Sequence, residues 1–285
     1  MKAVLETVSQ HRCFDGMQGF YQHHSEIIGL PMRFSVYQPP QAQYSSVPVL
    51  FFLAGLTCTE ETFMIKAGAQ RYAAKYGLML VTMDTSPRQT GLPGESVDWD
   101  LGAGAGFYLD ATVAPWSQYY RMETYITQEL REIVLAQFPA DKDRIGIFGH
   151  SMGGHGALTL ALRNPEIYQS VSAFAPVSSP MSCPWGQKAF THYLGETCER
   201  WRGHDATALI EDGCHHASLL LIDQGLDDPF LSEQLHPDRL EMACKKAKQK
   251  LILRYHEGYD HGYYFISTYI ADHLRHHRDL LNSSH

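Results

Sequence analysis

The chain opens with short segments in which β-branched and aromatic residues are frequent. Leu5–Phe14 and Gly19–Ile28 have this composition and flank the turn Asp15-Gly16, a combination that predicts a β-hairpin. Arg33–Tyr37 alternates polar and apolar residues, as a half-buried strand does, and is followed closely by Pro39-Pro40. This part of the chain is therefore expected to supply three strands.

Compact apolar runs follow, each typical of a strand that is buried on both faces of a parallel sheet. These runs are Val49–Leu53, Leu78–Met83, Ile145–Phe148, Val171–Phe174, Leu219–Ile222 and Leu251–Tyr255. Segments with the spacing of amphipathic helices separate most of them. They are Thr62–Tyr76, Met122–Gln137, Met152–Arg163, Pro237–Lys248 and Tyr263–His277. Alternating strands and helices require crossover connections, which predicts an α/β fold with a mostly parallel sheet of about nine strands flanked by helices.

No internal repeat or low-complexity linker divides the sequence, so residues 1–285 are expected to form one domain. Two stretches lack a clear helix or strand period and are predicted to be long loops. They are Thr85–Ser117, which is rich in Gly, Pro and Asp, and Pro176–Gly203. Long loops in a compact domain are often functional, so both are expected to shape a pocket.

Composition limits the classes of function. Hydrophobic residues make up 44% and charged residues 19%, which is enough apolar material for a large core. The net charge of -8 argues against nucleic acid as the main partner. The sequence has no membrane-length apolar run and no leader pattern in Met1–Gly16, so a cytoplasmic protein is expected. The six cysteines lack metal-type spacing and are taken as reduced thiols.

One pentapeptide carries candidate chemistry. Gly149-His150-Ser151-Met152-Gly153 fits the G-x-S-x-G pattern, in which a serine occupies a sharp strand-to-helix turn. The apolar run Arg144–Phe148 precedes it and the helical pattern Met152–Arg163 follows, as the turn requires. The start of that helix would direct free N–H groups toward the reacting atoms. Ser151 is therefore the predicted nucleophile, and the alternative is a glycine-rich turn with an incidental serine.

A nucleophilic serine needs a base, and the base needs a carboxylate to orient it. In folds with this turn the chain order is serine, acid, histidine. Asp223, Asp227 and Asp228 all follow a predicted strand. Asp223 is expected to cap the turn. Asp228 is favoured as the acid because it lies three residues after Gly225, and Asp227 stays open as the alternative.

His261 is the predicted base, because it lies in a glycine-flanked loop between the last predicted strand and a helix. His256 lies nearer the strand and is expected to be structural. His273, His276 and His277 share one helical face, which is expected to be a solvated surface, since no carboxylate or thiolate completes a four-ligand metal set. No metal is expected.

The oxyanion of an acyl-transfer intermediate needs fixed N–H donors. The backbone N–H of Met152, directly after the serine, is one candidate, and Leu56 in the loop after Val49–Leu53 is the other. Cys58 in the same loop is expected near the site, either as a small buried residue or as a thiol whose modification blocks substrate access. Gly102–Gly106 lacks the flanking strand and helix of a nucleotide-binding loop, and no cofactor is expected.

Several segments together are similar to the S-formylglutathione hydrolases, also called the esterase D family. They are Leu53–Thr59, Asp98–Asp100 leading into Gly102–Tyr108, Gly149–Gly156, Asp223–Gly225 with Asp228–Leu231, and Glu257–His261. The resemblance implies the α/β-hydrolase fold and assigns the triad to Ser151, Asp228 and His261. Leu101 departs from the family pattern, which favours Phe at that position, and would alter the pocket shape.

The same resemblance implies hydrolysis of S-formylglutathione to glutathione and formate in formaldehyde detoxification, side activity on short-chain esters, and a homodimer. A formyl group is small, so we expect Trp99 and Trp185 to narrow the acyl pocket. Two alternatives stay open. One is a general carboxylesterase or carbohydrate acetyl esterase on the same fold, and the other is a binding module that has lost catalysis.

Overall fold

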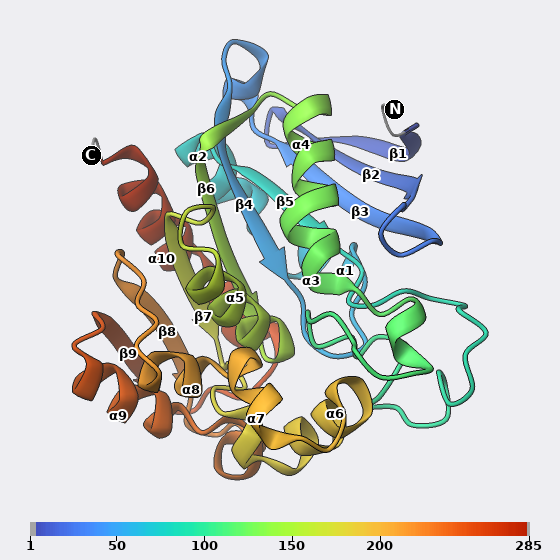
Figure 1. Ribbon diagram of the computed structural model, residues 1–285. Helices are drawn as coiled ribbons and strands as arrows, with labels where there is room; N and C mark the ends of the chain where they lie inside the picture. The colour runs from blue at the N-terminus through green and yellow to red at the C-terminus, as the bar shows by residue number, and fades with distance from the viewer. Residues whose placement is uncertain (1–3, 284–285) are drawn as a thin grey trace.

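The computed structural model describes residues 4–283, which are built around a nine-stranded sheet (Figure 1). Its strands are β1 Glu6–Cys13, β2 Gly16–His24, β3 Pro31–Gln38, β4 Val47–Leu53, β5 Met79–Met83, β6 Ala140–His150, β7 Ser170–Phe174, β8 Leu220–Gly225 and β9 Leu251–His256. Their order across the sheet is β1-β2-β3-β5-β4-β6-β7-β8-β9. The pairs from β1 to β5 in this order are antiparallel, and the pairs from β5 through β4 to β9 are parallel. The predicted mostly parallel sheet is confirmed.

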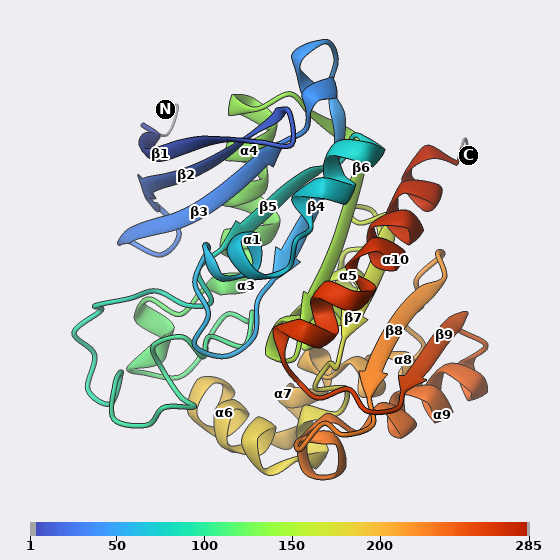
Figure 2. The same cartoon turned by 180° about the vertical axis from the view of Figure 1, so that it is seen from behind.

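Helices cover both faces of the sheet. On one face lie α3 Met122–Thr124, α4 Arg131–Gln137, α5 Met152–Arg163, α8 Ala206–Glu211 and α9 Pro237–Ala247 (Figure 1). The other face carries α1 Thr62–Lys66, α2 Gln70–Tyr76 and α10 Tyr263–Asn282 (Figure 2). Beyond the carboxyl ends of the parallel strands lie α6 Pro184–Leu194 and α7 Cys198–Trp201.

The two-sided cover explains the apolar character of the central strands. Every residue of β4, β5 and β7 is buried, and each strand is sandwiched between two apolar clusters. On one face Phe52 of β4 stacks on Phe63 of α1, with ring centroids 3.7 Å apart, and meets Phe148 of β6 edge-on. Burial of such large side chains supplies most of the driving force for this layer.

Two sequence predictions about helices need correction. Thr62–Tyr76 is two helices, α1 and α2, because Gly68 between them has φ 65°, outside the helical region. Pro176–Gly203 is not a long loop, since it contains α6 and α7. The helix α6 begins with Pro184 at its first position, and Cys183 Sγ accepts a hydrogen bond from the Gly186 N–H. Cysteine is not among the residues that usually cap a helix start, so the sequence around Cys183 does not indicate where α6 begins.

Most of the remaining predicted segments hold, although β2 begins at Gly16 and ends at His24, so Ser25–Ile28 of the predicted Gly19–Ile28 lies outside it. Met122–Gln137 is helical throughout, with Tyr125–Leu130 in a π-helical turn between α3 and α4. Thr85–Ser117 is confirmed as a long connection, with only a short 3₁₀ turn that starts at Trp116. Within residues 4–283, no helix combines the length and the apolarity needed to cross a membrane.

The histidines near the end of α10 do not form the solvated surface that the sequence suggested. His273 and His277 have no exposed area and face β7, and His276 is half-buried with its Nε2 3.1 Å from the Val171 carbonyl oxygen. The prediction of a solvated face is therefore wrong. The reason is that α10 packs flat against the sheet, so that even its polar positions meet strand residues.

Two serines of β7 supply hydrogen-bond partners to the buried rings of His273 and His277. The Ser170 hydroxyl lies 2.7 Å from His277 Nδ1, and the Ser172 hydroxyl lies 2.9 Å from His277 Nε2 and 2.8 Å from His273 Nδ1. The chain of contacts continues to Asp223, 3.3 Å from His273 Nε2. Buried polar groups are stable only when their hydrogen bonds are made, and here each imidazole has partners at both nitrogens.

We expect stability to fall as the pH decreases below about 6.5, the pKa of a histidine in an unfolded chain. Burial holds the pKa of His277 well below its usual value and also lowers the pKa of His273, so the folded protein keeps both rings neutral while the unfolded chain takes up protons. Each such ring costs about 1.4 kcal/mol of unfolding free energy per pH unit in this window. Thermal unfolding at pH 7.5, 6.5 and 5.5 measures the effect.

The variant His277→Gln should be less stable at pH 7.5 but lose less stability between pH 7.5 and 5.5 than the parent chain. Its matched control is His11→Gln, since His11 is exposed on β1. A melting temperature that is flat from pH 7.5 to 5.5, or equal slopes in parent and His277→Gln, would contradict the prediction.

Candidate active site

Ser151 stands on a strained turn between β6 and α5. Its backbone has φ 57° and ψ -119°, a conformation that costs a non-glycine residue about 1–3 kcal/mol. The glycines on either side permit the turn by close approach. A Cβ on Gly153 would lie 1.9 Å from the Leu53 carbonyl oxygen, and one on Gly149 would lie 2.1 Å from the Gly153 carbonyl oxygen. The G-x-S-x-G spacing is thus a steric requirement of this turn.

Backbone contacts hold the turn against neighbouring strands. The Ser151 N–H donates to the Phe174 carbonyl at 2.9 Å, and the Val177 N–H donates to the Ser151 carbonyl at 3.3 Å. Phe174 ends β7, so the position of the serine depends on the strand beside it. The side chain of Ser151 lines a cavity of about 280 Å³.

Asp228 and His261 meet beside the same cavity. His261 Nδ1 lies 2.5 Å from Asp228 Oδ2, and this carboxylate also accepts from the Gln224 amide at 3.2 Å and from the Phe230 N–H at 2.9 Å. Asp228 is buried, whereas Asp227 is exposed and joins the loop through its own N–H to the Tyr259 carbonyl. Of the two candidates for the acid, only Asp228 contacts His261.

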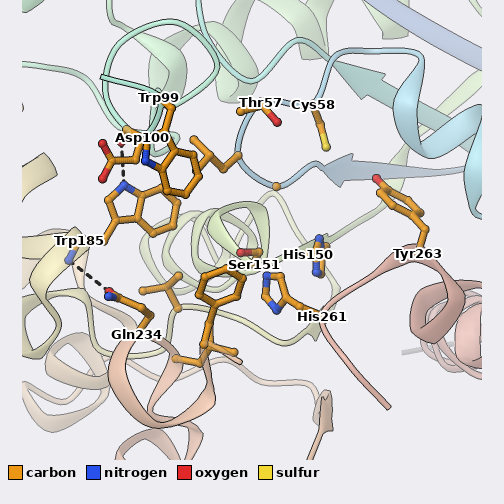
Figure 3. Close-up of a pocket in the computed structure, with 15 residues that line it drawn as sticks. Thr57, Cys58, Trp99, Asp100, His150, Ser151, Trp185, Gln234, His261 and Tyr263 are labelled. Atoms are coloured by element: carbon orange, nitrogen blue, oxygen red, sulfur yellow. Dashed lines mark hydrogen bonds between the residues drawn. The ribbon is translucent and has the colours of Figure 1, made fainter. Parts of the chain in front are cut away.

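Figure 3 shows the cavity with Ser151 and the His261 ring close to each other near its centre. Trp99 and Trp185 lie together on one side, and the Trp185 indole N–H donates to the Asp100 carbonyl at 2.7 Å. Trp99 is 70% exposed and lies at the rim, whereas Trp185 is half-buried. Both tryptophans therefore line the cavity, with Trp185 the more enclosed of the two.

Both candidate oxyanion donors border this cavity. Met152 is the first residue of α5, and an N–H at that position has no acceptor within its own helix. Leu56 lines the cavity, in a loop whose neighbouring N–H groups are engaged: Thr57 donates to the Gly104 carbonyl at 2.9 Å, and Cys58 donates to the Gly55 carbonyl at 3.2 Å. Within residues 4–283 the Leu56 N–H donates to no protein acceptor, which leaves it available to a ligand.

Cys58 lines the same cavity but does not have the character of a nucleophile. Burial raises the pKa of its thiol, so the thiolate is disfavoured at neutral pH. Its Sγ lies on the side of the cavity near Tyr263 (Figure 3). In the part of the chain that the structure describes, no three His, Cys, Asp or Glu side chains gather in a way that could hold a metal ion.

The structure adds residues to the site that the sequence did not single out. His150 is buried directly against His261, with ring centroids 4.5 Å apart, and burial together with the neighbouring His261 holds the pKa of His150 well below its usual value. Phe230 meets the His261 ring edge-on at 4.9 Å. Gln224 and Phe230 lie in segments already linked to the family resemblance, which was the available clue; the position of His150 inside the pentapeptide was another.

Asp223 of β8 and His256 of β9 take part in contacts that join the two strands near the site. Asp223 does not cap a turn as expected. Its carboxylate instead accepts two hydrogen bonds from Arg254 of β9, from Nε to Oδ1 and from Nη2 to Oδ2, each 2.6 Å long. Burial alone would raise the pKa of Asp223, but the hydrogen bonds from His273 and Arg254 outweigh it and hold that pKa well below its usual value. His256 Nε2 lies 3.4 Å from the same carboxylate, in keeping with a structural position. The ends of β8 and β9 are thereby fixed side by side.

Comparisons with known proteins identify relatives of this chain. The Esterase family model matches residues 25–277. The chain is 50% identical to the S-formylglutathione hydrolase of Mus musculus over 281 residues, covering 98% of this chain and 100% of that one. It is also 48% identical to the S-formylglutathione hydrolase of Paracoccus denitrificans, and the match covers 99% of this chain and 100% of that one. The solved S-formylglutathione hydrolase of Agrobacterium tumefaciens superposes with a TM-score of 0.95 at 48% identity, covering 97% of this chain and all of that one.

The fold, the nucleophile turn and these matches define an esterase with the α/β-hydrolase fold. Within that class, the chain belongs to the S-formylglutathione hydrolase family. The catalytic roles of individual residues stay predictions, and the contact between His261 and Asp228 makes them directly testable.

Asp228→Asn should lower kcat/KM by roughly 10³-fold or more, because an amide no longer fixes the histidine tautomer or stabilises its charged form. Asp227→Asn is the matched control: it changes the adjacent carboxylate, which is exposed, and should change kcat/KM little. Steady-state kinetics on p-nitrophenyl acetate measure both. Equal losses in the two variants, or the larger loss in Asp227→Asn, would show that the acid is wrongly assigned.

Proposed function

We propose that this chain is a serine thioesterase that hydrolyses S-formylglutathione to glutathione and formate, the second step of formaldehyde detoxification. The observation that carries the proposal is the contact of His261 with Asp228 at the cavity where Ser151 stands on its strained turn. The relatives named above supply the identity of the substrate. Trp99 and Trp185 line the same cavity as Ser151, a position from which they would limit the size of the acyl group.

The first half of the reaction forms an acyl-enzyme. His261 takes the hydroxyl proton of Ser151 as its oxygen attacks the formyl carbonyl carbon, and the N–H groups of Leu56 and Met152 receive the oxyanion. Collapse of the tetrahedral intermediate breaks the carbon–sulfur bond. The glutathione thiolate leaves with the electron pair of that bond and takes the proton from His261, which leaves formyl-Ser151.

The second half returns the enzyme to its starting state. A water molecule gives a proton to His261 and attacks the formyl ester through a second oxyanion intermediate. The ester bond then breaks, Ser151 regains its proton from His261, and formate is released. Asp228 remains a carboxylate throughout and stabilises the histidine in its charged form.

Selectivity for the acyl group is the first test of this proposal. Adding one methylene or methyl in a close-fitting pocket typically changes kcat/KM by roughly 10–200-fold. We expect S-formylglutathione to exceed S-acetylglutathione by a factor in this range and to exceed p-nitrophenyl acetate as well. Ser151→Ala should abolish turnover of all three substrates. A large preference for the simple ester would instead favour a general carboxylesterase or carbohydrate acetyl esterase.

The two tryptophans should contribute differently to this selectivity. Trp185→Ala should shift the ratio of kcat/KM for S-butyrylglutathione over S-formylglutathione upward, because it removes an enclosed wall of the cavity. Trp99→Ala is the comparison, and its shift should be smaller because that side chain is 70% exposed. Equal ratios in Trp185→Ala and the parent chain would show that Trp185 does not limit the acyl group.

A catalytically inactive binding module is the remaining alternative. It predicts that a fluorophosphonate probe fails to label Ser151, whereas the proposed thioesterase reacts stoichiometrically. The resemblance further supports the proposals that the chain is a single cytoplasmic domain and that it forms a homodimer with no nucleic-acid or membrane partner. Light scattering on the purified protein measures the oligomeric state.

A further inference from the structure

The loop that carries Leu56 has little structure of its own. Residues 54–59 follow β4 without forming a helix or strand. Thr57 within it has φ 67°, a left-handed conformation that is unfavourable for a β-branched residue. A loop with this backbone keeps one shape only if its surroundings hold it there.

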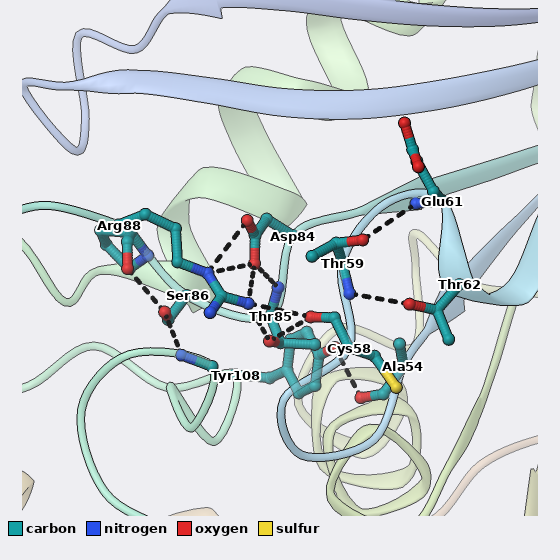
Figure 4. A network of polar contacts seen from close by, with 12 residues as sticks. Ala54, Cys58, Thr59, Glu61, Thr62, Asp84, Thr85, Ser86, Arg88 and Tyr108 are labelled. Carbon is teal, nitrogen blue, oxygen red and sulfur yellow. Dashed lines mark hydrogen bonds and ion pairs between the residues drawn. The ribbon is translucent and has the colours of Figure 1, made fainter. Parts of the chain in front are cut away.

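The side chains that hold it come from the segment after β5 (Figure 4). The carbonyl oxygen of Cys58 accepts a hydrogen bond from Thr85 Oγ1 at 2.8 Å and another from Arg88 Nη2 at 3.1 Å. The sulfur of Cys58 points away from this pair. The same residue therefore presents its thiol to the Ser151 cavity and its carbonyl to Arg88 behind the loop.

Arg88 is itself fixed by a carboxylate. Its Nε and Nη2 atoms donate to Asp84 Oδ1 at 2.9 Å and 2.7 Å, and the Asp84 side chain is only 9% exposed. A planar guanidinium bound at two atoms has one orientation, so its remaining donor directions are fixed as well. Arg88 and Asp84 line a hollow on the far side of the loop, together with Arg33 and Glu60, and neither lines the Ser151 cavity.

Further hydrogen bonds anchor the loop on both sides of Leu56. The Thr57 N–H donates to the Gly104 carbonyl at 2.9 Å, and the Gly104 N–H donates to Ser86 Oγ at 2.8 Å. The Tyr108 hydroxyl donates to the Ala54 carbonyl at 2.8 Å. Leu56 lies between these anchored positions, so the direction of its N–H is set by groups outside the cavity.

We propose that Arg88, held by Asp84, is a positioning residue for the oxyanion hole, acting through the Cys58 carbonyl to aim the Leu56 N–H at the developing negative charge. The inference rests on the proposed function only as far as Leu56 is a donor in acyl transfer. Oxyanion stabilisation depends on donors that are in place before the charge forms. Small displacements of a fixed donor are costly, so a clamp on its loop belongs to the catalytic apparatus although it touches no substrate.

Arg88→Met keeps the length and the apolar stem of the side chain and removes the guanidinium. We expect kcat and kcat/KM to fall together by roughly 10–100-fold, less than the 10²–10³-fold typical of losing a donor outright. The inhibition constant of an aliphatic trifluoromethyl ketone, which places an oxyanion in the hole, should rise by a similar factor. All values are normalised to the active sites that a fluorophosphonate titrates.

Two milder variants keep the test decisive if Arg88→Met folds poorly. Thr85→Val removes only the second donor to the Cys58 carbonyl and should give a smaller loss in the same direction. Arg88→Lys keeps the positive charge but cannot donate to Asp84 from two nitrogens. Its kcat/KM should lie between that of Arg88→Met and that of the parent chain. Arg33→Met is the matched control, because this exposed arginine lines the same hollow but bonds Gln22 rather than the loop.

The assays use both S-formylglutathione and p-nitrophenyl acetate, since the same oxyanion forms from each. If the parent chain cleaves only the simple ester, the proposed substrate is wrong, and the effect of Arg88→Met on that ester still decides the inference. The inference would be overturned if Arg88→Met left kcat per titrated site and the ketone inhibition constant unchanged. It would also be overturned if the variant changed KM alone. A loss equal to that of Arg33→Met would overturn it as well.

Discussion

The backbone of Ser151 lies in a region of conformational space that L-residues avoid, and most of the site follows from what makes this tolerable. The turn exists because β6 and α5 meet at an angle that leaves no room for a Cβ on Gly153, 1.9 Å from the Leu53 carbonyl oxygen. Its strain is offset by the burial of α5, whose first eleven residues are all buried. A loosely packed helix could not hold the serine in this conformation.

The same constraint places the oxyanion loop. Leu53 pairs with Gly149 in the register of β4 and β6, so the loop after β4 and the turn after β6 begin at the same level of the sheet. The close approach of Gly153 to the Leu53 carbonyl oxygen keeps the start of α5 against the end of β4, and Leu56 and Ser151 line one cavity. Strand register, a property of the core, thus places the loop of Leu56 beside the turn of Ser151, as the proposed oxyanion hole requires.

Local patterns in the sequence were sufficient for the sheet and for the candidate triad, because buried strands, the glycine spacing and the loop positions are all short-range features. Chain order and the G-x-x-D spacing favoured Asp228 but left Asp227 open, and the folded chain shows that Asp228 is the one in contact with His261. What failed depended on partners distant in sequence or on an uncommon local cap. His273 and His277 look like a polar helix face until Ser170 and Ser172 of β7 are placed opposite them, and α6 begins at Cys183, which is an unusual cap. Arg88 lies four residues after its partner Asp84, but its contact with the Cys58 carbonyl, thirty residues away, forms only in the folded chain.

The two aspartates near the end of β8 show how environment assigns roles that residue type leaves open. Asp223 and Asp228 are both buried and each faces a histidine, but Arg254 holds Asp223 at two atoms and satisfies its charge within the core. Asp228 meets no such cation; its partners are an amide, a backbone N–H and His261. The charge of Asp223 is thus paired within the core, whereas Asp228 has only hydrogen-bond donors around it, and one of its oxygens faces the His261 ring. The carboxylate without a cation is therefore the one that contacts His261, and that histidine lines the cavity of Ser151.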